Sequence, residues 1–154
     1  MGTYSFKSAG KDVSQYRAEI PQRAALPIGI KTPLRIDDKN LFAMHYSLSE
    51  QIHDNLRNLL LTNWGERLGL YNFGANLQEL TTELSNIDAF DDAAIARIRD
   101  AVSTWMPFVS LNDFVSETDN ERNSVTGIVK ITITYSVPEL GVENKALQIK
   151  LYVI

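Results

Sequence analysis

Three glutamates are the side chains whose type and spacing fit acid–base chemistry. Glu66 precedes Glu79 and Glu83, and the latter two are four residues apart. A glycosidase needs two carboxyl groups about 5 to 10 Å apart, one of them a general acid with a raised pKa. Carboxylates four apart on a helix are, however, commonly solvated or ion-paired. The pattern therefore favours no catalytic residue, and a glycosidase remains an alternative.

Other catalytic and cofactor chemistries lack the residues they need. The sequence contains no Cys, which excludes disulfides, thiol nucleophiles and Cys-ligated metals. His45 and His53 are the only histidines, and no HExxH or HxH cluster surrounds them. Neither a GxSxG motif nor a nucleotide-binding glycine pattern is present. We therefore predict no catalytic residue, no metal site, no cofactor and no small-molecule substrate.

The composition indicates one soluble globular domain with an appendage. The chain has 154 residues, 44% of them hydrophobic and 22% charged, and a formal net charge of -4. No apolar run approaches the ~20 residues of a membrane-spanning helix, and the first residues show no secretory signal. The basic residues are scattered and lack an aromatic platform, which disfavours nucleic acid as a partner. We expect no membrane and no nucleic-acid partner.

Residues 1–40 differ from the rest of the chain in charge and in proline content. They carry seven basic and four acidic side chains, whereas the remainder carries eight basic and fifteen acidic ones. Three of the five prolines lie here, each of which removes a backbone donor and favours extended geometry. We predict an extended basic arm over residues 1–40 and a single domain over 41–154. A disordered tail is the alternative, but the apolar run Leu26–Ile36 requires a surface to lie on.

The first part of the domain has a helical period. A helix is predicted over residues 47–62, opened by a capping box between Ser47 and Glu50. A second helix follows from about residue 76. A third begins near Asp91 and Asp92, where the helix dipole favours carboxylates, and ends before Pro107.

After Pro107 the apolar period changes from 3.6 to 2. Residues 127–137 alternate apolar and polar side chains, which is typical of a half-buried strand. The last segment repeats the pattern, with Leu147, Ile149, Leu151 and Val153 on one face. A weaker strand is predicted over residues 109–115, followed by a mobile loop over 116–124. Helices followed by strands predict an α+β fold with a small antiparallel or mixed sheet.

Three landmarks occur in order along this domain. The apolar helix Leu59–Thr62 leads to Gly65-Glu66-Arg67, the segment Phe73–Glu83 has Phe-Gly followed by spaced Leu and Glu residues, and Trp105-Met106-Pro107-Phe108 comes last. The chain in this way resembles the baseplate wedge or sheath-initiator family of contractile-tailed phages, historically labelled lysozyme-like. Met106 and Phe108 replace the charged pair of the family's Trp-Glu-Pro-Arg.

The resemblance implies a structural protein of the virion tail baseplate, assembled in the host cytoplasm. Its expected partners are other wedge subunits, the tail sheath protein, and the tail tube or hub. Its C-terminal strands are expected to template the first sheath ring. The alternatives are a peptidoglycan-cleaving enzyme, which the old label suggests, and a transient tail-completion or chaperone role.

Three groups of residues are the predicted partner-binding sites. The turn Gly65-Glu66-Arg67 offers a permissive glycine and a five-donor guanidinium, although Glu66 and Arg67 could instead form only an internal pair. Met106, Pro107 and Phe108 are expected to form a hydrophobic junction in place of a salt bridge. Leu147, Ile149, Leu151 and Val153 belong to the third group. Phe73, Gly74, Leu77, Leu80 and Trp105 are expected to be structural.

The C-terminal strand ends the sequence with little charge and without proline. At the edge of a sheet such a strand offers unpaired amides and carbonyls to another strand. We expect this edge to accept a strand of the sheath protein. The alternative is a strand internal to the domain's own sheet.

Overall fold

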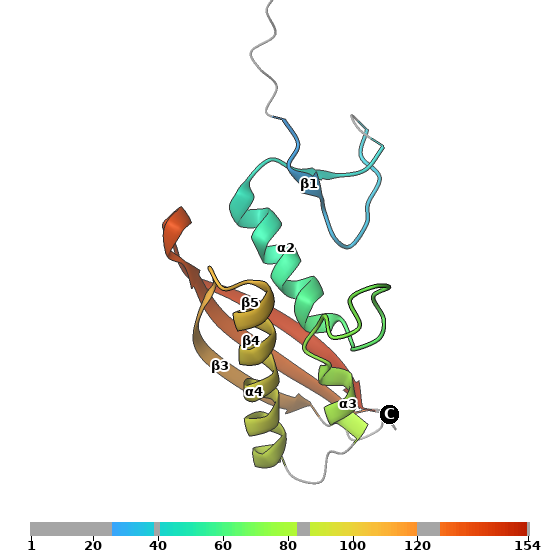
Figure 1. Cartoon of the computed structure of the whole chain (residues 1–154), viewed down its shortest axis with the longest axis vertical. Helices are drawn as coiled ribbons and strands as arrows, with labels where there is room; N and C mark the ends of the chain where they lie inside the picture. The colour runs from blue at the N-terminus through green and yellow to red at the C-terminus, as the bar shows by residue number, and fades with distance from the viewer. Residues whose placement is uncertain (1–25, 39–40, 83–86, 120–126, 154) are drawn as a thin grey trace, which may run out of the picture.

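Three helices and a three-stranded antiparallel sheet form the body of the described chain. The computed structural model describes residues 26–38, 41–82, 87–119 and 127–153. The helices α2, α3 and α4 precede the strands β3, β4 and β5, and a short pair, β1 and β2, lies near the start of α2 (Figure 1). This arrangement confirms the predicted α+β class. No helix in these ranges is long and apolar enough to cross a bilayer.

Helix α2, Leu48–Leu61, lies close to its predicted bounds because its apolar residues recur on one face. Leu56, Leu59 and Leu60 are fully buried there. The predicted capping box is wrong, since the Ser47 side chain makes no cap hydrogen bond. The Glu50 carboxylate instead lies 3.3 Å from His45 Nδ1, a partner outside the helix.

Helices α3, Leu77–Thr82, and α4, Ile87–Trp105, pack beside α2. The predicted start of α4 is wrong, because the helix begins four residues before Asp91. Asp91 therefore lies inside the helix and accepts a hydrogen bond of 2.6 Å from the Ser116 hydroxyl. The helix ends two residues before Pro107, as expected, since a proline disfavours helical geometry in the residue before it.

The sheet has the order β3-β4-β5, so β4 is central and β5 lies at an edge. Strand β4 spans Gly127–Val137, as predicted, and β5 spans Val142–Val153 after the 3-10 turn Pro138–Leu140. Strand β3 spans Ser110–Asp119. The predicted loop is therefore wrong for residues 116–119, which pair with 128–131 of β4 through the backbone ladder. Its continuation, residues 120–124, lies outside the described residues.

One face of the sheet carries the helices and holds the core (Figure 1). Every second residue of β4 from Val129, and of β5 from Leu147 to Leu151, is buried on this face, whereas the intervening side chains of these strands are exposed or half-buried and β3 has only half-buried or exposed side chains among residues 110–117. The buried strand residues are Val129, Ile131, Ile133, Tyr135, Val137, Leu147, Ile149 and Leu151. Helices α2 and α3 contact β5, and α4 contacts β3. The opposite face is open among the described residues.

The segment before α2 is attached to the body by a buried polar cluster. Strand β1, Gly29–Ile30, pairs antiparallel with β2, Met44–His45. His45 Nε2 lies 2.7 Å from Asp54 Oδ2, which also accepts a 2.8 Å hydrogen bond from the Thr32 amide. Burial raises the pKa of Asp54, but the hydrogen bonds from Thr32 and His45 outweigh it and hold that pKa below its usual value. Residues 26–38 therefore contact their own domain, and residues 1–25 lie outside the described part.

Candidate functional site

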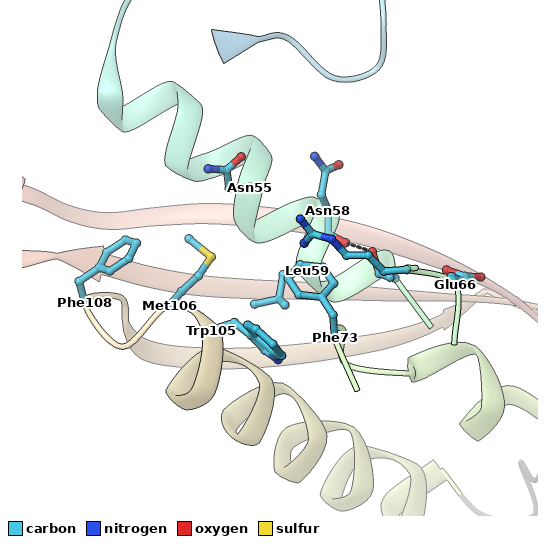
Figure 2. A pocket seen from close by; sticks show the side chains of 10 residues that line it. Asn55, Asn58, Leu59, Glu66, Phe73, Trp105, Met106 and Phe108 are labelled. Carbon is cyan, nitrogen blue, oxygen red and sulfur yellow. Dashed lines mark hydrogen bonds between the residues drawn. The ribbon is translucent and has the colours of Figure 1, made fainter. Parts of the chain in front are cut away.

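The structure brings two of the predicted binding clusters into one groove. Glu66 and Arg67, from the loop after α2, line it together with Met106 and Phe108, which follow α4. The groove has a volume of about 690 Å³, and the other lining residues are Asn55, Asn58, Leu59, Thr62, Phe73 and Trp105. Figure 2 shows Glu66 and Phe108 at its opposite ends, with Asn55 and Asn58 along the α2 side. Segments about 40 residues apart in the sequence thus form one surface.

The groove has an apolar floor. Leu59 and Met106 belong to the core, and the Phe73 ring meets the Trp105 ring edge-on at a centroid distance of 5.2 Å. Met106 is only 6% exposed, whereas Phe108 is 38% exposed. Met106 therefore does not offer its side chain to the hydrophobic junction predicted for residues 106–108, because the turn after α4 directs this side chain into the core. Phe108 and the exposed Pro107 beside it offer apolar surface to a partner.

Gly74 fixes the loop that carries Phe73. Its φ is +112°, and a Cβ there would overlap the Thr62 carbonyl. This close approach lets Ala75 N–H donate to Leu59 O and Asn76 N–H donate to Thr62 O, so the loop lies against the end of α2. The structural role predicted for Phe73 and Gly74 is consistent with these contacts, and Leu77, Leu80 and Trp105 pack in or against the core.

Glu66 and Arg67 do not pair with each other, and each contacts another residue of the loop. Both Glu66 oxygens accept hydrogen bonds from Asn63, at 2.8 Å from its amide and 2.9 Å from its side chain. These bonds lower the pKa of Glu66. The Arg67 guanidinium lies 4.3 Å from the centre of the Phe73 ring. The turn itself is closed by Gly65 N–H donating to Tyr71 O, at a glycine φ of +85°.

The glutamates do not form a glycosidase pair in the described residues. A general acid requires a raised pKa, whereas that of Glu66 is lowered. Glu79 accepts hydrogen bonds from Asn76 at 2.6 Å and from Arg97 at 2.9 Å, as expected for an ion-paired helix carboxylate. Glu83 lies outside the described residues. Residues 26–38, 41–82, 87–119 and 127–153 also contain no group of three side chains suited to a metal ion.

Strand β5 is a second candidate binding site, and it offers a partner its backbone groups and not its apolar side chains. Leu147, Ile149 and Leu151 are buried against the protein's own helices, so their side chains are not available to a partner. This corrects the sequence-based expectation for these three side chains. Val153 ends the strand, and its side chain lies outside the described part.

The outer edge of β5 carries no other strand in the described residues. Gln78 Nε2 donates to the Tyr152 carbonyl at 2.8 Å, so this carbonyl points away from β4. Because strand geometry repeats every two residues, the backbone groups of Lys150 and Gln148 point the same way. The β3 edge carries a bulge near Asn112 and the acidic residues Asp113, Glu117 and Asp119, whereas the irregularity in β5 is confined to its start, between Val142 and Lys145. From Ala146 to Val153, β5 pairs with β4 without a register shift and carries one charged residue, Lys150, so this part of its edge is not blunted by a bulge or by acidic residues.

A hydrogen-bonded pair beneath the sheet connects α2 to β4. His53 Nδ1 lies 2.9 Å from the Tyr135 hydroxyl, and Tyr135 is fully buried. Burial raises the pKa of Tyr135 to about 12, with a smaller contribution from Asp54. Burial also lowers the pKa of His53, and Lys145 adds to this effect. Both groups are therefore held in their neutral forms near pH 7.

Asn55 and Asn58 are groove residues that the sequence did not indicate. They lie three apart on the exposed side of α2, where asparagines are usually solvated. Only the position of the loop after α2 turns this helix face into one wall of a groove. The uncharged side chains at both exposed helix positions are the one feature of the sequence that could have indicated a binding surface here.

Comparison with known proteins gives a family and a fold. The family model described as "Baseplate wedge protein gp25" matches residues 46–139. A chain of the anti-feeding prophage baseplate, determined by cryo-EM, is 21% identical with a TM-score of 0.57, covering 70% of this chain and 82% of that one. A candidate tail lysozyme from Geobacter sulfurreducens is 20% identical with a TM-score of 0.53, covering 69% and 89%. At these identities the two structures establish a shared fold, and no curated protein matches the sequence.

Proposed function

Because this chain belongs to the baseplate wedge protein gp25 family, it is a structural component of a tail baseplate, and we propose that it starts the sheath through strand β5. The proposal extends to contacts with other wedge subunits through the groove. Residues 41–154 would act as the assembling domain, and residues 1–40 as an arm that lies across a neighbouring subunit. The described part of this arm has Leu26 and Ile36 each 85% exposed, which supports a surface for a partner.

The observation that carries the proposal is that no strand in residues 26–38, 41–82, 87–119 and 127–153 pairs with the outer edge of β5. An added strand would hydrogen-bond to the outward backbone groups of Gln148 and Lys150, while β4 and the helices hold the other side of the strand. A sheath subunit that donates such a strand would be fixed in register, because a one-residue slip reverses every side chain. The first sheath ring could thereby take its orientation from the baseplate.

The test is a substitution that removes one backbone N–H group from the outer edge of β5 and leaves the strand in place. Deleting the strand would not serve, because Leu147, Ile149 and Leu151 are core residues. Lys150 is exposed and its amide points outward, so Lys150→Pro is compatible with an edge strand but leaves no N–H for an added strand. We expect this variant to enter baseplates normally and to start few sheaths, counted by electron microscopy of assembled tails.

The matched control is Lys150→Ala, which removes the charge and keeps the amide. It should start sheaths as the unchanged protein does. The double variant Gln148→Pro with Lys150→Pro should reduce initiation further. Normal sheath assembly on baseplates that carry the double variant would contradict the role of the β5 edge.

The enzymatic alternative has weaker support. The name of the Geobacter sulfurreducens protein refers to a lysozyme, but in this chain Glu66 has a lowered pKa and Glu79 is paired with Arg97. A general acid that protonates a glycosidic oxygen needs the opposite environment. We therefore propose a structural role without catalysis.

A further inference from the structure

Two asparagines on the α2 wall of the groove have side-chain N–H groups that donate to no residue in the described part of the chain. Asn55 Oδ1 accepts from Gln51, and Asn58 Oδ1 accepts from Thr32. Each side-chain oxygen therefore already accepts one hydrogen bond, and the side-chain N–H groups of both asparagines are available to acceptors of a partner. Donors on an exposed wall require no internal partner, but they select for acceptors in whatever binds there.

Arg67 adds a positive charge to the groove, whose lining also includes the Glu66 carboxylate. No carboxylate pairs with its guanidinium in the part of the chain that the structure describes, where its one recorded contact is the Phe73 ring. The nearest acid along the chain, Glu66, has both oxygens committed to Asn63. Stacking on Phe73 limits the orientations of the guanidinium, so its donors are arranged before a partner arrives.

Apolar surface lies beside these donors. Phe108 is partly exposed at one end of the groove, and Trp105 and Met106 form the floor between Phe108 and Phe73 (Figure 2). A volume of about 690 Å³ accommodates several side chains of an extended peptide. The same surface thus offers an apolar patch next to a cation.

From this combination we propose that the groove binds a segment of a neighbouring baseplate polypeptide carrying an Asp or Glu close to a bulky apolar residue. The inference rests on the proposed structural role and names the chemistry of one partner. The carboxylate pairs with Arg67 in a two-pronged hydrogen bond. The apolar side chain packs against Phe108 and Trp105, and backbone carbonyls of the segment accept from Asn55 and Asn58.

Because the chain contains no Cys, a single introduced thiol gives a specific probe. Asn55→Cys, labelled with a photoactivated crosslinker and assembled into baseplates, should crosslink to another polypeptide at a segment that contains Asp or Glu. Asp92→Cys, on the exposed side of α4, is the control and should not give this product. The inference is overturned if the Asn55→Cys product contains only this chain, contains a segment without an acidic residue, or does not form.

Charge reversal tests the ion pair itself. Arg67→Glu should lower incorporation into baseplates by at least about tenfold, since like charges then face each other. Changing the crosslinked acidic residue of the partner to Arg should restore incorporation. Arg99→Glu, at an exposed arginine of α4, should leave incorporation unchanged. Equal incorporation of Arg67→Glu and the unchanged protein would overturn the pairing.

The two proposals fail in different ways. Particles that contain the chain and start sheath, but give no crosslink from the groove, overturn only the inference about the groove. Absence of the chain from purified particles overturns the structural role, and the inference with it.

Discussion

Replacing Gly74 by alanine should destabilise the loop that shapes the groove. Gly74 has a φ of +112°, and an added Cβ would overlap the backbone carbonyl of Thr62. The overlap is with backbone and not with a flexible side chain, so it is relieved only by moving the loop away from α2. That movement would weaken the hydrogen bonds from Ala75 to Leu59 and from Asn76 to Thr62.

Two contributions set the loss of unfolding free energy expected for Gly74→Ala. A positive φ costs an alanine about 1 kcal/mol or more, and steric overlap in a packed site adds about 2 kcal/mol. The sum of about 3 kcal/mol corresponds to a Tm decrease of about 6–12 °C for a chain of this length. Thermal unfolding followed by circular dichroism measures this change.

Gly69→Ala is the matched control. Gly69 also has a positive φ, +79°, but nothing lies within 4 Å of an added Cβ. Gly69→Ala should therefore lose only the free energy that a positive φ costs an alanine. This cost is about 1 kcal/mol, which corresponds to a Tm decrease of about 2–4 °C. If Gly74→Ala melts no lower than Gly69→Ala, the close contact with Thr62 does not stabilise the loop and the reasoning is refuted.

Two further predictions concern the buried tyrosine and the absence of catalysis. The pKa of Tyr135, raised to about 12 from an ordinary 10.0, favours folding below pH 10, and this contribution is lost as the pH rises towards 12. The unchanged protein should therefore lose about 2 kcal/mol more unfolding free energy than Tyr135→Phe between pH 10 and 12 in urea titrations, and parallel losses would contradict this. Purified protein should not clear a suspension of cell walls, and clearing that is lost on substitution of Glu66 or Glu79 would overturn the structural assignment.

The sequence predicted those elements whose side-chain pattern matches their burial. Strand β4 alternates apolar and polar residues along its whole length, so its bounds followed from the pattern alone. Residues 116–119 of β3 have no such alternation and join the sheet through backbone hydrogen bonds to β4, which composition does not reveal. The acidic pair Asp91 and Asp92 predicts a helix start that is too late, because Phe90 before them is already a core residue of α4.

The site was predicted only in part, because a groove is a property of tertiary structure. Arg67 and Phe108 were named from local sequence landmarks, but nothing local shows that their segments meet. Met106 belongs to the same sequence landmark as Phe108, but the turn after α4 buries the Met106 side chain. The edge position of β5 likewise depends on strand order, which the sequence left open between an edge and an internal strand.

The most direct test of the account is a cryo-EM reconstruction of the assembled baseplate with its first sheath ring. The account predicts a strand of the sheath protein hydrogen-bonded to the backbone of Gln148 and Lys150 on the outer edge of β5. A reconstruction in which that edge faces solvent, or is covered by this chain's own residues, would contradict it.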